Sequence, residues 1–104
     1  MKLDNYLIYN YLIYLIIKTI PHEIGQLFNL QLFDLSNNKI KTIPPEIGQL
    51  SNLKILFLNK NKITTIPPEI GKLSKLQYLY LRGNEITTIP NNLKLFLKHI
   101  TFTY

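Results

Sequence analysis

The chain has 104 residues, carries a formal net charge of +6 at neutral pH and contains neither cysteine nor tryptophan. This length corresponds to one domain at most, and the lack of cysteine excludes a disulfide framework, which is consistent with a reducing compartment. Hydrophobic residues make up 46% of the sequence, which is enough for a core. Alanine and valine are missing, while residues with A/T-rich codons dominate. Because codon bias also favours lysine, the positive charge is weak evidence of function.

The N-terminal part of the chain contains a mostly apolar run, YLIYNYLIYLII, at residues 6–17. This run is shorter than the roughly 20 residues that a membrane-spanning helix needs. Lys2 ahead of the run would suit a signal peptide, but Asp4 follows it and no small-residue cleavage site is present. We therefore interpret the run as part of a degenerate repeat, with a targeting segment as the alternative.

The centre of the chain contains two nearly identical stretches. Residues 42–63 read TIPPEIGQLSNLKILFLNKNKI, and residues 65–86 read TIPPEIGKLSKLQYLYLRGNEI. The repeat period, from Thr42 to Thr65, is therefore 23 residues. A fixed period of this size indicates one supersecondary unit stacked on itself. We predict a single domain over residues 1–104, built from a degenerate repeat at 7–29, repeats at 30–52, 53–75 and 76–98, and a partial strand at 99–104.

The repeats at 53–75 and 76–98 begin with the pattern L-x-x-L-x-L-x-x-N-x-I. The repeat at 30–52 differs only by Phe33 at one leucine position, whereas Asn10 and Leu15 break the pattern in the repeat at 7–29. The period-two spacing of the pattern predicts a short strand that turns Leu56 and Leu58 inward and Phe57 outward. In the return half of the repeat, isoleucine before proline is held extended, and the second proline suits the first position of a short helical turn. We expect one strand and one helical turn per repeat, and no repeat is expected to be stable without its neighbours.

The fourth repeat departs from the others, because it reads PNNL at residues 90–93 where the pattern has PPEI. The repeat period still places Phe96 in line with Leu73 as a core residue, and places His99 at an apolar position of the last strand. No recognisable cap follows this repeat. We therefore expect apolar surface at the ends of the stack, as in a fragment of a longer array.

One polar column runs through the apolar pattern, formed by Asn38, Asn61 and Asn84. Where a strand bends away, backbone N–H and C=O groups lose their ladder partners and must be satisfied in another way. An inward asparagine amide offers two donors and an acceptor. We predict a structural asparagine ladder that joins each coil to its neighbour, in preference to a row of ligand-binding amides.

The strand pattern and the TIPPEIGxLxxL return together resemble a leucine-rich repeat. They are similar to the 23-residue subtype of the Ras-binding and plant intracellular Ras-group-related repeat proteins, over about residues 12–96. The resemblance implies an α/β solenoid: a right-handed coil with a parallel concave sheet of about four to five short strands, and short helical or 3-10 turns on the convex side. Members of the family mostly act as protein-binding scaffolds, often in signalling.

Outward strand positions on the expected concave face are rich in aromatic and aliphatic residues. Such a patch is typical of a binding surface, and tyrosine and arginine are favoured at binding hot spots. With the family's use of this face, the predicted partner-binding residues are Asp34, Ile55, Phe57, Asn59, Tyr78, Tyr80 and Arg82. The alternative is that strand propensity and codon bias alone place these residue types on the sheet surface.

Catalytic and metal-binding patterns are missing from the sequence. His22 and His99 are the only histidines, and they fall at opposite ends of the expected solenoid. No metal-ligand spacing, phosphate-binding glycine motif or nucleophile–base pair occurs. We therefore expect no enzyme, no metal and no cofactor. Because the lysines are scattered rather than gathered on one face, nucleic acid is not expected as a partner.

The sequence thus predicts a scaffold for protein–protein interaction that binds another protein on its concave face, in the cytoplasm and in intracellular signalling. A Ras-like GTPase as the partner is implied by the family resemblance alone. The alternative is a fragment or decayed member of a longer repeat array with no independent partner, which the degenerate first repeat favours.

Overall fold

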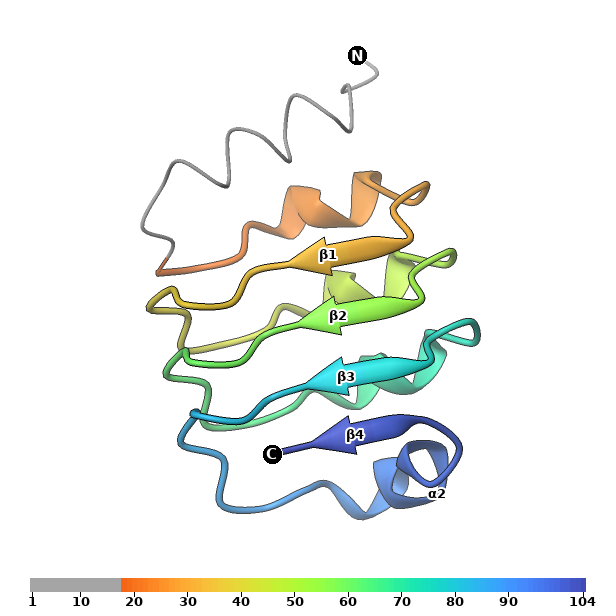
Figure 1. The fold of residues 1–104 in the computed structure, drawn as a ribbon. Helices are drawn as coiled ribbons and strands as arrows, with labels where there is room; N and C mark the ends of the chain where they lie inside the picture. Colours follow the sequence, from red (N-terminus) through yellow and green to blue (C-terminus); the bar gives the residue numbers. More distant parts are fainter. Residues whose placement is uncertain (1–17) are drawn as a thin grey trace.

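A parallel sheet of four short strands runs through residues 18–104, the part of the chain that the computed structural model describes (Figure 1). The strands are β1 (Leu32–Asp34), β2 (Ile55–Phe57), β3 (Tyr78–Tyr80) and β4 (Thr101–Thr103), and they lie side by side in sequence order. Leu56 pairs with Leu79, and Leu79 pairs with Phe102, so each step across the sheet is one repeat period along the chain. The strand portion of the degenerate repeat predicted at 7–29 lies outside the described residues.

A short helical turn precedes each of the four strands, on the return half of its coil. These turns are the 3-10 helices η1 (His22–Gln26), η2 (Pro45–Gln49), η3 (Pro68–Lys72) and η4 (Asn91–Leu93), the last of which continues into the α-helix α2 (Lys94–Leu97). Figure 1 shows these helices together on one side of the sheet. Helices η2 and η3 begin at the second proline of a Pro-Pro pair, because its fixed φ is already helical and its missing N–H is not needed there.

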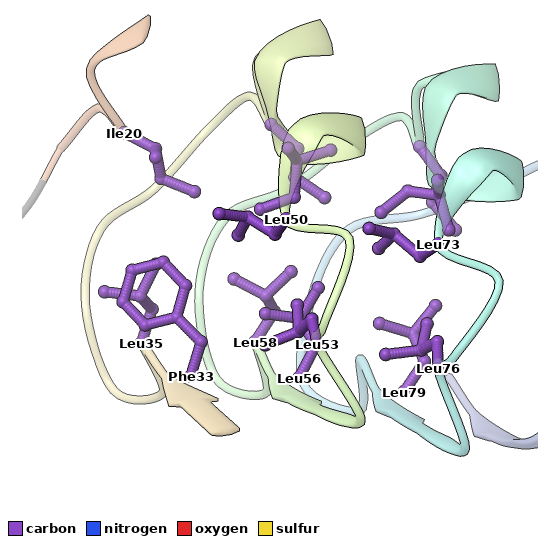
Figure 2. Packing of buried hydrophobic residues seen from close by; sticks show 14 of the residues in the cluster. Ile20, Phe33, Leu35, Leu50, Leu53, Leu56, Leu58, Leu73, Leu76 and Leu79 are labelled. Atoms are coloured by element: carbon purple, nitrogen blue, oxygen red, sulfur yellow. The ribbon is translucent and has the colours of Figure 1, made fainter. Parts of the chain in front are cut away.

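The core lies between the sheet and the helical turns (Figure 2). Leu56 and Leu79 enter it from the strands. Leu50 and Leu73 enter it from the turns, and none of the four side chains is exposed to solvent. Burial of each such side chain stabilises the fold by about 1.5–3 kcal/mol. The predicted α/β solenoid, with inward leucines on a parallel sheet and helical turns behind it, is confirmed.

The fourth repeat differs from the prediction by one residue. Phe96, predicted as the core residue in line with Leu73, is only half-buried, whereas Leu97 is buried. The reason is the type of helix. A 3-10 helix brings residues three apart to the same side, but the chain after Leu93 enters the α-helix α2, which has 3.6 residues per turn. The next buried residue therefore comes four positions after Leu93 rather than three.

The same shift explains why His99 does not occupy an apolar strand position. The structure exposes His99 and packs Ile100 against the core in its place. The register is restored directly afterwards, because Thr101 pairs with Tyr78 as the repeat period requires. The prediction for His99 was therefore wrong, whereas the position of the last strand was predicted correctly.

Candidate functional site

The sheet has a face that points away from the helical turns. In β1, β2 and β3 the middle residue is buried and its two neighbours point to the opposite side. These neighbours, with the equivalent residues of β4, form the outer sheet face: Leu32, Asp34, Ile55, Phe57, Tyr78, Tyr80, Thr101 and Thr103. Because adjacent strands are about 4.8 Å apart, residues that follow one another across the sheet are in side-chain contact.

An aromatic wall, formed by Phe57, Tyr78 and Tyr80, stands on the outer sheet face. The rings of Phe57 and Tyr80 are stacked, with centroids 4.9 Å apart and planes at 10°. The ring of Tyr78 lies parallel to that of Tyr80, with centroids 6.2 Å apart and planes at 6°. Each such pair contributes about 0.5–1.5 kcal/mol beyond simple burial. Tyr78 is still 37% exposed and the other two rings are half-buried, so the aromatic wall keeps apolar area in contact with solvent.

An open hollow of about 410 Å³ lies against the aromatic wall. We call it the sheet hollow, and it is lined by Phe57, Asn59, Tyr80, Arg82 and Thr103. Its volume is within the usual range of ligand-binding clefts, about 300–1,000 Å³. The first four of these residues belong to the predicted binding set. Thr103 does not, although its pairing with Tyr80, one repeat period earlier in the chain, is the signal that could have added it.

The other three predicted residues lie outside the sheet hollow. Ile55 and Tyr78 pair with each other across β2 and β3, on the neighbouring column of the outer sheet face. Asp34 is on β1, where its Oδ1 accepts hydrogen bonds from the Ser36 hydroxyl at 2.6 Å and from the Ser36 N–H at 3.0 Å. The Asp34 carboxylate is therefore held by its own loop.

The sheet hollow carries positive charge. Arg82 lines it and is exposed, and Lys60 is adjacent, since its backbone N–H donates to the Arg82 carbonyl oxygen at 2.8 Å. Within residues 18–104 the one close contact between a basic nitrogen and a carboxylate oxygen joins His22 Nε2 to Glu23 Oε1 at 3.1 Å, and these residues are far from the sheet hollow in the sequence. No carboxylate in that part of the chain therefore neutralises the Arg82 guanidinium.

The inward asparagines contact the backbone rather than the outer sheet face. Asn61, which is 6% exposed, accepts a hydrogen bond from the N–H of Ile40 at 3.1 Å and donates one to the carbonyl oxygen of Leu35 at 3.0 Å. Both partners are in the preceding coil. Asn84 repeats this geometry one coil later, and the amide of Asn38 donates within its own coil. These amides therefore occupy positions that suit a ladder between coils.

A larger hollow, of about 830 Å³, lies at the C-terminal end of the coil stack. We call it the end hollow. Its lining includes Leu97, Phe102 and Tyr104, and the rings of the last two are stacked at 5.2 Å. Phe102 pairs with Leu79, so it continues the inward column of the core. The end hollow is thus an extension of the core and is separate from the outer sheet face.

Residues 18–104 contain no group of three or more histidine, cysteine, aspartate or glutamate side chains that could hold a metal ion. His22 and His99 are both exposed. Among these same residues, no helix has the length and apolar character needed to cross a membrane.

The comparisons with known proteins agree on one family. The leucine-rich repeat family matches residues 28–86 and 51–102. A comparison with curated proteins finds no match. Among solved structures, a leucine-rich repeat protein of Leptospira interrogans is 41% identical over 85% of this chain, with a TM-score of 0.78. The BIR2 ectodomain of Arabidopsis thaliana is 30% identical over 72% of this chain, with a TM-score of 0.64.

A third solved structure, the plant peptide hormone receptor RGFR1 in complex with RGF2, is 35% identical over 83% of this chain, with a TM-score of 0.68. This chain spans 22%, 41% and 14% of the three similar structures, in the order given. The matched residues cover most of the sequence and coincide with the coils of the structure. The chain therefore belongs to the leucine-rich repeat family.

Proposed function

We propose that the protein is a protein-interaction module that binds its partner on the outer sheet face. Leucine-rich repeat proteins act in general through protein–protein interaction. The observation that carries the proposal for this chain is the exposed aromatic wall beside the sheet hollow. Parallel sheets are normally covered on both faces. Here the helical turns cover one face, and a partner protein would cover the other.

The proposed partner is a protein or peptide. One similar structure is a peptide hormone receptor solved with RGF2, which supports a ligand of this chemical class. The resemblance to the 23-residue Ras-group-related repeats supports a Ras-like GTPase and a role in intracellular signalling. A cytoplasmic location is proposed on that resemblance and on the lack of cysteine. The similarity to the BIR2 ectodomain instead favours an extracellular location.

A second candidate is a segment of a longer repeat array that has no partner of its own. The observation that favours it is the short span of this chain relative to similar structures, 14–41% of their length. In this case the chain would interact only by packing coil against coil, so its contact would be made at the end hollow rather than on the outer sheet face.

The test compares two double variants in affinity capture from the source cell. Phe57→Ala/Tyr80→Ala removes the stacked pair from the outer sheet face. The control, Phe28→Ala/Leu95→Ala, removes side chains that are 48% and 70% exposed and lie off that face. We expect wild type and control to capture the same partner and the first variant to lose it, with both variants folded by circular dichroism. Equal capture by all three would count against the outer sheet face.

A further inference from the structure

We propose that the sheet hollow recognises an acidic, extended peptide segment in which a carboxylate pairs with Arg82 and an apolar side chain packs against Phe57 and Tyr80. The inference rests on the proposed function and deepens it, because it states the chemistry of the partner. It follows from the charge, the shape and the hydrogen-bonding groups of one part of the outer sheet face.

The charge of the sheet hollow favours an acidic ligand. The sheet hollow is lined by Arg82 and by no acidic residue, and the backbone of Lys60 is hydrogen-bonded to that of Arg82. The acidic residue of the outer sheet face, Asp34, pairs with Phe57 from β1 but does not line the hollow, and its carboxylate accepts hydrogen bonds from Ser36. Arg82 is exposed in the free protein, and a partner seated on the sheet hollow would exclude water from it, which strengthens its attraction to an anion. The planar guanidinium also suits a carboxylate, which it binds with two parallel hydrogen bonds.

The spacing of Tyr80 and Arg82 along the chain suits an extended peptide. Tyr80 is the last residue of β3, and Arg82 follows two residues later in the turn, where its carbonyl oxygen still accepts a hydrogen bond from the Lys60 N–H of the preceding coil at 2.8 Å. Both side chains line the sheet hollow, and two residues of extended backbone span about 6.6–6.8 Å. An extended peptide has the same spacing between alternate side chains. A peptide lying along β3 can therefore place an apolar side chain on the Phe57–Tyr80 pair and a carboxylate on Arg82, two residues away.

The remaining lining residues suit a peptide backbone. Asn59 offers two amide donors and one acceptor, and Thr103 offers a hydroxyl group that both donates and accepts. These groups flank the aromatic wall and would satisfy peptide N–H and C=O groups that lose water on binding. A nucleic acid strand is less well matched, although aromatic rings and arginine also bind single strands. The other cations, such as Lys41, Lys72 and Lys98, lie on loops and helical turns rather than around the hollow.

The experiment uses the full chain and a bead library of random nine-residue peptides. We expect the selected peptides to be enriched in aspartate or glutamate placed two residues from a large apolar residue. Arg82→Glu should reverse the charge preference toward lysine and arginine. For a selected peptide measured by fluorescence polarisation, Arg82→Gln should weaken binding by about tenfold or more. Arg82→Lys should weaken it less, because it keeps the charge and loses only the paired geometry.

The matched control is Lys41→Gln, which removes the same charge from an exposed loop position and should leave the affinity unchanged. Selected peptides without acidic enrichment, or an affinity that Arg82→Gln does not alter, would overturn this inference. If such peptides still required Phe57 and Tyr80, the proposed function would stand. The inference would also be overturned if no peptide were selected, or if the hollow bound a single-stranded DNA oligonucleotide in place of peptides. The affinity capture of a folded partner tests the proposed function separately.

Discussion

Asn61 shows at the scale of a single residue how one coil is joined to another. Its amide bonds the backbone of the preceding coil at two points, and it also donates to the Leu58 carbonyl oxygen of its own coil at 3.0 Å. We predict that Asn61→Ala lowers the free energy of unfolding by about 1–3 kcal/mol, because buried backbone groups lose their partners. Urea denaturation followed by circular dichroism measures this change.

Asn52 provides the matched control for that substitution. Its amide also donates to a carbonyl oxygen of the preceding coil, that of Phe28 at 2.9 Å, but this hydrogen bond is exposed to solvent. Water can replace the lost group, so Asn52→Ala should lower the free energy of unfolding by less than about 1 kcal/mol. The same loss of stability in both variants would mean that burial does not determine the importance of these amides.

Side-chain direction was more predictable from the sequence than backbone conformation. The inward position of Leu56 and the outward position of Phe57 follow from period-two spacing alone. The turn after each strand was not predicted. Asn37, Lys60 and Gly83 occupy it with φ of 60°, 58° and 82°, a left-handed conformation. Asparagine and glycine are common there, but lysine gives no such signal, and the neighbouring coils determine its conformation.

The helical turns pack against one another, and at the scale of these elements the glycines determine how closely they approach. A methyl group on Gly48 in η2 would lie 2.8 Å from the backbone carbonyl oxygen of Glu69 in η3. A methyl group on Gly71 in η3 would contact only the Leu93 side chain, at 3.3 Å. The same residue type in the same position of consecutive repeats therefore has different surroundings.

We predict that Gly48→Ala lowers the free energy of unfolding by about 1–3 kcal/mol, because the backbone of η3 must move to admit the methyl group. Gly71→Ala should change it by less than about 0.5 kcal/mol, since the Leu93 side chain can adjust and alanine favours the helix. Thermal unfolding of the two variants, made in the same background, measures the difference. A larger loss for Gly71→Ala would contradict this account of how the turns stack.

The fourth repeat shows where a sequence period stops being informative about an element. Pro68 and Gly71 mark the 3-10 helix η3, whereas the fourth repeat has Asn91 and Lys94 at those positions. Without these residues the chain continues into an α-helix, and the core position moves by one residue. The period located β4 correctly because pairing with β3 depends on register across the sheet. It could not locate Leu97, because that position depends on the local helix type.

At the scale of the whole molecule, the stack of coils combines a charged surface with an apolar end. The chain has a net charge of +6, which opposes contact between copies at low salt. Within residues 18–104, β4 pairs with β3 on one side only. The lining of the end hollow beside it contains Leu97, Phe102 and Tyr104, together with polar residues and the lysines Lys94 and Lys98. Unpaired strand edges next to apolar surface favour association between copies.

We predict that the protein self-associates through the end hollow, and that association increases with salt as the repulsion between positive charges is screened. Tyr104→Lys should reduce association, because it adds a charge to the lining of the end hollow, where Tyr104 is 58% exposed. Leu95→Lys is the control, since Leu95 is 70% exposed and outside that lining. Sedimentation velocity over a range of protein and salt concentrations measures the effect. Equal association of the two variants would place the contact elsewhere.

Binding of an acidic peptide should weaken over the same salt range in which association increases. Salt screens both the attraction between the peptide carboxylate and Arg82 and the repulsion between positively charged copies, so the first equilibrium loses stability and the second gains it.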